Sequence, residues 1–427
     1  MANRGGEEWL PTAEAARRLG VKRETLYSYV SRGMLSSRPS PTGRGSLFDR
    51  AEVASLASRA RSGGRAGALE VVVDSRLTLL DPRGRLWFRG WDVEEACRRA
   101  GFEQVAAWLW SEDDDPAELL SRPSQACSAP ESQLSLARAA ASALPPGATP
   151  IERLRLGVAA AASDDPLRFD RRREGVAGSG RRILACAVAA LGSGVDPASG
   201  IARSLWTGLA SRDQATGASG TPPGEVVAAV DAAPVVAALD AALVLLADHE
   251  LSSSTLAARV AASTWADPYL VVLAGLAALG GPLHGGMGDR VASLVRAAAE
   301  RGAATAVGEQ MRQDEAVVGF GHMVYTERDP RGTALLEVVR AAWPGHPAVK
   351  AGDEIIRIVA AGGRTFPNVD FGLGVLLAAG GFSEGSAEVV FATARIAGWL
   401  AHAIEEYGHR LRYRARAAYT GLRPAGA

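Results

Sequence analysis

The sequence is poor in the residues that build disulfide frameworks, zinc sites and long sheets. Its 427 residues include three cysteines, Cys97, Cys127 and Cys186, which are widely spaced and form no metal-ligand pattern. There are only nine Phe and seven Tyr, so we expect no long sheet. No apolar run approaches the roughly 18 residues of a membrane span, and the first ten residues contain no apolar signal core. We therefore expect a cytoplasmic protein with no metal site and no redox cofactor.

The net charge of zero hides a basic N-terminal segment. Residues 1–65 hold 12 Lys and Arg against 6 Asp and Glu, a net charge of +6, so the rest of the chain carries −6. A basic head on an acidic body indicates different partners for the two parts. With 47% hydrophobic and 22% charged residues, the chain has an ordinary globular composition, and its length allows two or three domains.

The N-terminal segment has the pattern of two short helices followed by a hairpin. We expect a first helix over residues 13–19, with Thr12 as its N-cap. A second helix is expected from about 23 to 32. Its inward face would consist of Leu26, Tyr29 and Val30. Residues 36–48 are rich in Gly, Pro and Arg, which is typical of a β-hairpin wing.

A further helix over about 50–60 and a flexible linker complete this module. The order of elements resembles the winged helix-turn-helix of MerR and excisionase proteins. If the module binds DNA, its second helix enters the major groove by its N-terminal end. The residues facing bases or phosphates would then be Lys22, Arg23, Thr25 and Ser28, with Arg44 on the wing. A protein-docking or oligomerisation element is the alternative.

From about residue 70 the pattern changes to that of a helical body. Two β-prone runs surround a Pro-Arg-Gly turn in RLTLLDPRGRLWFRGW, and a helix is expected to follow. Beyond it, nearly every stretch is rich in Ala, Leu and Val at helical spacing, as in 227–247, 256–279 and 388–407. Residues 111–150 are expected to form loops between short helices. The body should be mainly α-helical.

Candidate catalytic side chains are concentrated in the C-terminal half. His249 lies in LLADHEL, while His284 in GPLHGG and His322 in VGFGHMVY have glycine neighbours that leave an imidazole uncrowded. Asp370 follows a Pro-Asn turn between apolar residues, and partial desolvation there would raise its basicity. Capping of the next helix is the other reading of Asp370. Arginines accompany these residues: Arg331, Arg395 and Arg414.

Five segments in this order closely resemble the signature segments of citrate synthases. They are RLTLLDPRGRLWFRGWDVEEA, LLADHELSSSTLAARVAAST, GPLHGG, VGFGHMVYTERDPRG, and FPNVDFG followed by ARIAGWLAHAIEEY. The resemblance covers roughly residues 70–427. It implies a mainly α fold with a large domain of residues 70–283 and 377–427 and a small domain of residues 284–376. The helix-turn-helix module would occupy residues 1–62 and the linker 63–69.

The resemblance also implies roles for individual residues. Asp370 would take a proton from the acyl-CoA, His284 would stabilise the resulting enolate, and His322 would polarise the ketone of oxaloacetate. The residues that hold the dicarboxylate would be His249, Arg331 and Arg395. Arg414 would complete the site of a partner subunit in a homodimer. A thioester substrate activated in this way requires no metal or redox cofactor.

The sequence leaves the acyl group and the use of the site open. Citrate synthase acting on acetyl-CoA is the first interpretation, and 2-methylcitrate synthase acting on propionyl-CoA is an alternative, because one methylene is worth only about 1–3 kcal/mol in a pocket. A metabolite-sensing DNA-binding regulator is the interpretation from a different class. The chain has Met287-Gly288 where the family usually has Ala-Asn, and Met323 where it often has Arg. These departures put acyl-CoA preference and turnover in question.

Overall fold

The structure is a computed structural model of the whole chain. It describes residues 9–19, 21, 26–27, 29–30, 35–40, 45–50, 52–53, 72–113, 115–210, 232–281, 284–313, 316–363, 365–409 and 412–414. The chain folds as two compact units, residues 1–74 and 75–427.

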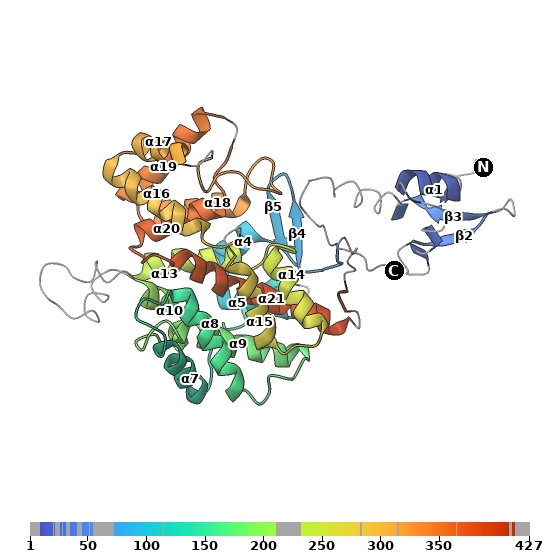
Figure 1. Cartoon of the computed structure of the whole chain (residues 1–427), viewed down its shortest axis with the longest axis horizontal. Coiled ribbons are helices and arrows are strands. Elements are labelled where there is room, and N and C mark those ends of the chain that lie inside the picture. Colours follow the sequence, from blue (N-terminus) through green and yellow to red (C-terminus); the bar gives the residue numbers. More distant parts are fainter. Residues whose placement is uncertain are drawn as a thin grey trace, which may run out of the picture. The chain divides into compact units, whose positions relative to one another are not determined.

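The N-terminal unit is built on a small antiparallel sheet with strand order β1-β3-β2 (Figure 1). Its elements are β1 (Trp9–Pro11), α1 (Thr12–Leu19), β2 (Ser37–Pro39) and β3 (Ser46–Asp49). The predicted hairpin is therefore confirmed as the β2–β3 pair. The first helix is confirmed as well, and the Thr12 hydroxyl donates to the carbonyl oxygen of Ser46 at 2.9 Å, which ties α1 to β3.

The second predicted helix is described only in part. Residues 26–27 and 29–30 are helical. Leu26 is fully buried, and Tyr29 and Val30 pack on the same small core, as predicted for the inward face. The five predicted DNA-contacting residues and the linker lie outside the described residues: Lys22, Arg23, Thr25, Ser28, Arg44 and residues 63–69. The winged helix-turn-helix assignment therefore stays a prediction.

The second unit begins with the predicted hairpin. Strands β4 (Thr78–Asp81), β5 (Arg85–Phe88) and β6 (Trp91–Asp92) form an antiparallel sheet in that order. Asp92 ends β6 and caps α4 (Val93–Arg99), because its carboxylate accepts from the backbone N–H groups of Glu94 and Glu95. The tight turn uses Gly84, whose φ of +103° is open to few other residues.

Helices dominate the rest of the second unit. Those up to residue 279 are α5 (Phe102–Trp110), α6 (Pro116–Ser121), α7 (Glu131–Ser142), α8 (Pro150–Ala161), η1 (Ala162–Asp164), α9 (Arg173–Ala189), η2 (Pro197–Ser199), α10 (Ile201–Leu209), α13 (Ala232–Leu246), α14 (Ser253–Ser263) and α15 (Pro268–Leu279). The later ones are α16 (Met287–Arg301), α17 (Ala303–Gln313), α18 (Pro330–Ala342), α19 (Pro347–Ala361), α20 (Val369–Ala379) and α21 (Ser386–Gly408). The prediction of a mainly α-helical body is confirmed.

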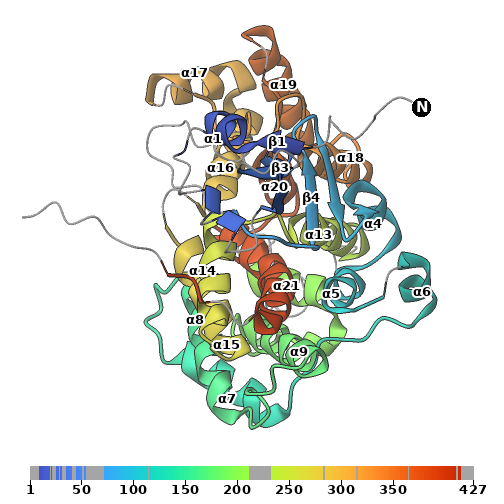
Figure 2. The same cartoon turned by 90° about the vertical axis from the view of Figure 1, so that its right-hand side faces the viewer.

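One predicted helical run is wrong, because residues 256–279 form two helices. Trp265 adopts a positive φ of 64°, which ends α14. Asp267 then caps α15 by accepting from the N–H groups of Tyr269 and Leu270, and Pro268 occupies the first helical position. The apolar spacing continues across this break, so periodicity alone did not reveal it. The two helices pack against each other and against α21 (Figure 2).

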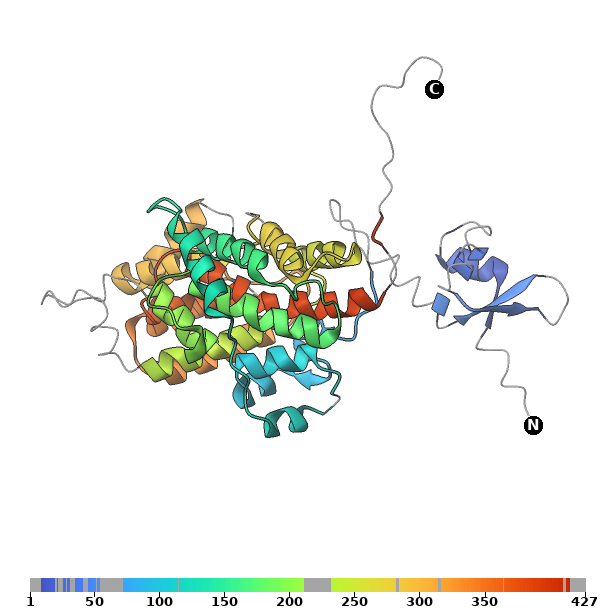
Figure 3. The ribbon, with the colours of Figure 1, turned by 90° about the horizontal axis from the view of Figure 1, so that it is seen from below.

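The central element is α21, which runs through the middle of the helical body (Figure 3). By length and composition it could cross a membrane, but 83% of its apolar window is buried among other helices, as in a core helix. It approaches α15 closely, because a Cβ at Gly275 would lie 2.6 Å from the indole of Trp399. This packing fixes α21 against α15 in the helical body.

Helices α16 to α20 gather at one end of the second unit, at the top of Figures 1 and 2. Within the group, α16 packs on α17, α19 and α20, and α18 packs on α20. The group contacts the remaining helices through the pairs α13–α18, α13–α20, α4–α18, α16–α21 and α20–α21, among others. The division into a large domain and a small domain at residues 283/284 and 376/377 stays a prediction.

Candidate active site

The loop that carries His322 is bonded to the segment that carries Asp370. Gly319 and Gly321 both have positive φ, and the loop between them turns back on residues 366–368. The N–H of Gly321 donates to the Phe366 carbonyl at 2.8 Å, and the N–H of Asn368 donates to the Gly319 carbonyl at 2.9 Å. Backbone pairing therefore brings the two predicted catalytic segments side by side.

The ring of His322 is fixed as a hydrogen-bond donor. Its Nδ1 accepts from the backbone N–H groups of Val324 at 3.1 Å and Tyr325 at 3.3 Å, so the ring proton of the neutral form lies on Nε2. Burial, together with the charges of Arg331 and Arg395, lowers the pKa of His322 to about 4. The side chain is therefore neutral near pH 7 and can donate through Nε2 to a carbonyl oxygen.

His249 completes an aromatic cluster beside His322. The two imidazole rings meet edge to face with centroids 5.2 Å apart. The His249 Nε2 lies 3.1 Å from the Tyr325 hydroxyl, and the Tyr325 ring packs 4.8 Å from the His322 ring. Burial and the charge of Arg331 hold the pKa of His249 well below its usual range. The two imidazoles are therefore uncharged near pH 7, and the charges that act on them belong to Arg331 and Arg395.

Arg331 is held by a buried carboxylate that the sequence did not single out. It lies in the first turn of α18 and is 2% exposed. Its Nε and Nη2 donate to the two oxygens of Asp329 at 3.0 and 2.8 Å. Asp329 also accepts from the N–H of Val369, so one carboxylate joins the N-termini of α18 and α20. Nη2 of Arg331 lies 3.4 Å from Nε2 of His322, which places its guanidinium beside the imidazole ring.

Arg395 is a buried cation with free hydrogen-bonding capacity. It lies in the middle of α21 with 2% of its surface exposed, and within the described part of the chain its Nε and Nη1 have no hydrogen-bond partner. Burial and the charge of Arg331 lower the pKa of Arg395 to about 10, while Asp248 and Asp370 oppose that shift, so it stays charged near pH 7. Buried polar groups are usually paired, so the two guanidinium nitrogens are available to donate to an anionic ligand.

Asp370 and His284 line one small cavity. The other lining residues are Leu279, Gly285, Gly286, Gly288, Leu373, Ala387, Glu388 and Phe391. Burial raises the pKa of Asp370 to about 6, although the charges of Arg331 and Arg395 act in the opposite direction. Asn368, and not Asp370, caps α20 by accepting from the Phe371 N–H, so the capping interpretation of Asp370 is wrong.

His284 is oriented by a serine that sequence reasoning missed. Its Nε2 lies 2.9 Å from the hydroxyl of Ser254, in the first turn of α14. If that hydroxyl donates, the ring proton lies on Nδ1 and can be given to an oxygen atom in the cavity. Burial lowers the pKa of His284, which favours this neutral form. The segment DHELSSS offers three serines, and only the packing of α14 selects Ser254.

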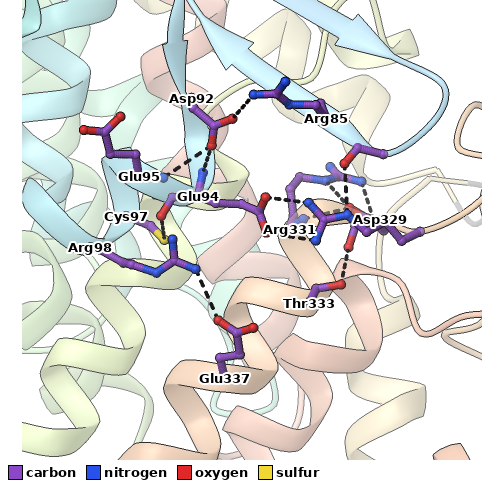
Figure 4. A network of polar contacts seen from close by, with 12 residues as sticks. Arg85, Asp92, Glu94, Glu95, Cys97, Arg98, Asp329, Arg331, Thr333 and Glu337 are labelled. Atoms are coloured by element: carbon purple, nitrogen blue, oxygen red, sulfur yellow. Dashed lines mark hydrogen bonds and ion pairs between the residues drawn. The ribbon is translucent and has the colours of Figure 1, made fainter.

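The loop between His322 and Arg331 is bonded to the β4–β5 hairpin and to α4. The guanidinium of Arg328 donates to both oxygens of Glu94 at 3.1 and 2.5 Å and to the Gly84 carbonyl at 3.2 Å. Figure 4 also shows a contact between α4 and α18, in which Nη2 of Arg98 donates to Oε2 of Glu337 at 3.2 Å. A Cβ at Gly84 would lie 2.4 Å from the Arg328 side chain, so the hairpin turn and the loop require glycine there.

Arg414 does not join these residues. It is exposed and follows the end of α21, where the Tyr413 hydroxyl donates to Glu406 and the Tyr413 N–H donates to Ser263. The described contacts fix its segment against α14 and α21. The role predicted for Arg414, in the site of a partner subunit, stays a prediction.

Comparison with known proteins agrees with this arrangement. The family described as citrate synthase, C-terminal domain, matches residues 68–416. Citrate synthase 2 of Bacillus subtilis is 36% identical over 183 residues, which are 42% of this chain and 49% of that protein. The chain thus spans about half the length of that relative. 2-Methylcitrate synthase 1 of Corynebacterium glutamicum is 28% identical over 344 residues, 79% of this chain and 89% of that protein.

Solved structures show the same fold. Citrate synthase from Thermoplasma acidophilum, in a ternary complex with carboxymethyl coenzyme A and oxaloacetate, superposes with a TM-score of 0.64 at 24% identity, covering 84% of this chain and 96% of that one. Citrate synthase from Thermotoga maritima gives a TM-score of 0.59 at 23% identity, covering 86% and 97%. Because the family match spans most of the chain and the fold agrees, the chain belongs to the citrate synthase family, whose members are transferases.

Proposed function

We propose that the protein condenses acetyl-CoA with oxaloacetate and hydrolyses the citryl-CoA intermediate to citrate and CoA. One observation carries the proposal: Asp370, a carboxylate whose pKa is raised to about 6, lines the same cavity as the oriented imidazole of His284. A base near neutral pKa beside a hydrogen-bond donor suits removal of a proton next to a thioester. The ternary complex of the Thermoplasma acidophilum relative supports the choice of substrates.

The first step uses the cavity of Asp370 and His284. Asp370 takes a proton from the carbon next to the thioester carbonyl, and negative charge develops on the carbonyl oxygen. His284 donates its Nδ1 proton in a hydrogen bond to that oxygen, a contribution worth about 3–4 kcal/mol for a fixed donor. Ser254 holds the opposite ring nitrogen at 2.9 Å, which keeps the donor aimed into the cavity.

The second step uses the charged cluster. Arg395 offers two guanidinium nitrogens to a carboxylate of oxaloacetate. Arg331 and His249 both lie beside His322. His322 donates from Nε2 to the ketone oxygen and transfers a proton as the new carbon–carbon bond forms. The charges of Arg331 and Arg395 both act to lower the pKa of Asp370. This interaction supports a single reaction centre that contains the arginines as well as Asp370 and His284.

A purified-protein assay tests the proposal. The full chain is incubated with oxaloacetate and either acetyl-CoA or propionyl-CoA, and release of free CoA thiol is followed over time. We expect release that depends on both substrates and is lost in Asp370→Asn. Faster turnover of propionyl-CoA would select the 2-methylcitrate alternative. Binding of oxaloacetate without any release of CoA would instead support the metabolite-sensing regulator.

We also propose a cytoplasmic homodimer in which Arg414 reaches the site of the partner subunit. The fixed placement of its segment by Tyr413 supports a defined position for this exposed arginine. Family resemblance supports the dimer, and the amino-acid composition supports the location.

DNA binding by the N-terminal unit is a second candidate function. Three observations favour it. They are the β2–β3 hairpin, the burial of Leu26 in the core of the unit, and the net charge of +6 over residues 1–65. The measurement is a salt titration of binding to random duplex DNA, with the full chain compared with a chain that starts near Gly67. Counterion release predicts affinity that falls steeply with salt and disappears with the truncation. Weak, salt-insensitive binding by both proteins would leave the unit without a DNA role.

A further inference from the structure

Tyr325 contacts three side chains of the candidate site, although the sequence did not single it out. It follows His322 by three residues and is 2% exposed. The centroid of its ring lies 4.8 Å from that of His322 and 5.5 Å from that of His249. The guanidinium carbon of Arg331 lies 5.7 Å from the same centroid. Tyr325 could therefore act on a ligand through any of the three, and its individual contacts decide between them.

The contacts of Tyr325 with His322 and Arg331 do not require a tyrosine. Its backbone N–H donates to Nδ1 of His322 at 3.3 Å, and every residue except proline has this group. Phenylalanine would keep the packing of the ring on His322 and its position beside Arg331. Only the hydroxyl distinguishes tyrosine from phenylalanine, so any specific role of Tyr325 depends on the contact that its hydroxyl makes.

The hydroxyl of Tyr325 bonds to His249. Its oxygen lies 3.1 Å from Nε2 of His249, and within the described part of the chain this is its one hydrogen bond. Burial raises the pKa of Tyr325, so the hydroxyl keeps its proton near pH 7. Burial and the charge of Arg331 lower the pKa of His249, so its ring is neutral there. Both partners are therefore uncharged, and each carries one hydrogen atom that it can donate.

The pair formed by Tyr325 and His249 keeps one hydrogen-bond donor for another group. The two side chains carry two such hydrogen atoms, and the bond between them uses one. If the hydroxyl donates to Nε2, the hydrogen of the imidazole lies on Nδ1 and is left over. If Nε2 donates to the hydroxyl oxygen, the hydrogen of the hydroxyl is left over. In either arrangement, one donor remains available to a ligand.

The neighbours of this pair favour a ligand that supplies oxygen acceptors. The ring of His249 meets the ring of His322 edge to face at 5.2 Å, and Nη2 of Arg331 lies 3.4 Å from Nε2 of His322. The carboxylate of Asp329 already accepts from Arg331 through both of its oxygens. A carboxylate of a ligand suits a region that combines a neutral donor with a neighbouring arginine.

We propose that Tyr325 is a positioning residue whose hydroxyl fixes the ring of His249, so that the pair donates one hydrogen bond to a carboxylate of the substrate. This inference rests on the proposed function for the identity of that substrate, oxaloacetate. Without the hydroxyl, Nε2 of His249 loses its partner, and the neutral ring can carry its hydrogen on either nitrogen. Neither residue lines the cavity of Asp370 and His284, so the loss should affect oxaloacetate and spare the acyl-CoA.

Tyr325→Phe tests the proposal, because it removes the hydroxyl and keeps both the ring and the backbone N–H that donates to His322. We expect the KM for oxaloacetate to rise about tenfold, as for loss of a hydrogen bond to a charged group, while the KM for the acyl-CoA changes less than about twofold. Nitrogen-15 NMR of the imidazoles, with the His249 signals assigned from their loss in His249→Leu, gives a second readout. The His249 signals should show one tautomer in the wild type and a mixture of both in Tyr325→Phe.

Tyr269→Phe is the matched control. Tyr269 is a fully buried tyrosine of α15 whose hydroxyl donates to Asp165 at 2.9 Å, so this variant also loses a buried hydrogen bond, but outside the candidate site. We expect it to melt at a lower temperature and to keep the wild-type KM for both substrates. If Tyr325→Phe also melts lower and keeps the wild-type KM for oxaloacetate, the hydroxyl is only structural and the inference is wrong.

A double substitution tests whether the hydroxyl acts through His249. In a His249→Leu background, adding Tyr325→Phe should change the Kd for oxaloacetate less than about twofold, because the bond between the two side chains is already lost. A full tenfold effect in that background would show that Tyr325 acts independently of His249 and would contradict the positioning role.

Failure of the proposed function would look different. A wild-type protein that releases no CoA but binds oxaloacetate in calorimetry refutes the reaction, and Tyr325→Phe and Tyr269→Phe are then compared by Kd, with the same tenfold expectation. A wild-type protein that binds no oxaloacetate overturns both the reaction and the inference.

Discussion

Protonation of Asp370 should set the acid limb of the pH–rate profile. The carboxyl must be ionised to act as a base, and burial raises its pKa to about 6. About 90% of it is then ionised at pH 7 and about 10% at pH 5, so kcat/KM for the acyl-CoA should fall roughly tenfold between these values. An aspartate with the ordinary pKa of 3.8 would remain more than about 90% ionised at pH 5 and would give a flat profile.

Solvent perturbation separates this carboxyl from the histidines of the site. A medium of lower dielectric constant disfavours the charged form of any group, so it raises the pKa of a carboxyl and lowers that of an imidazole. Burial already lowers the pKa of His284, and that of His322 lies at about 4, so protonation of either would also reduce activity at low pH. The inflection should move to higher pH when an organic cosolvent is added.

The assay measures CoA release in quenched samples between pH 5 and pH 8, with and without cosolvent. Circular dichroism at pH 5 and recovery of activity on return to pH 7 exclude unfolding as the cause of the loss. A profile that stays flat to pH 5, or an inflection that moves to lower pH in cosolvent, would refute the assignment of the limb to Asp370.

Three further predictions concern binding, assembly and packing. Arg395→Ala should raise the Kd for oxaloacetate about 10- to 100-fold in calorimetry, since a charge-assisted pair is worth about 1.5–3 kcal/mol, and an unchanged Kd would remove Arg395 from the site. Mixing Arg414→Ala subunits with Asp370→Asn subunits should restore activity if sites are shared, and a mixture that stays inactive after verified subunit exchange contradicts sharing. Gly275→Ala should lower stability by about 1–3 kcal/mol, measured by denaturant unfolding, because its methyl group would overlap Trp399, whereas an unchanged midpoint would mean that α15 shifts without cost.

Local signals in the sequence correctly predicted the two hairpins and the helical character of the body. The Pro-Arg-Gly turn between apolar runs gave the β4–β5 hairpin, and the Ala- and Leu-rich spacing gave the helical body, since both depend on neighbours within a few residues. The same reasoning failed at Trp265, where the apolar spacing hid a break between α14 and α15. It also left Asp370 with two readings, until the structure showed Asn368 as the cap of α20.

Within the candidate site, the sequence by itself determined which residue types were present and in which order. Glycine neighbours marked His284 and His322, and a Pro-Asn turn marked Asp370, because these features are local in the chain. Only the tertiary structure showed that Ser254 orients His284 and that Asp329 holds Arg331. Such partners are chosen by the packing of helices that lie far apart in sequence, and no local pattern encodes that choice.

The buried contacts of His402 with Asp248 and Arg259 show the same limit most clearly. In sequence, His402 is one polar residue in an apolar helix, and Asp248 precedes a histidine that draws more attention. They form a buried chain because Gly398 lets the end of α13 approach α21 closely, and because α14 brings Arg259 to the other side of His402. Burial makes these charges interact strongly, and burial is a property of the folded molecule alone.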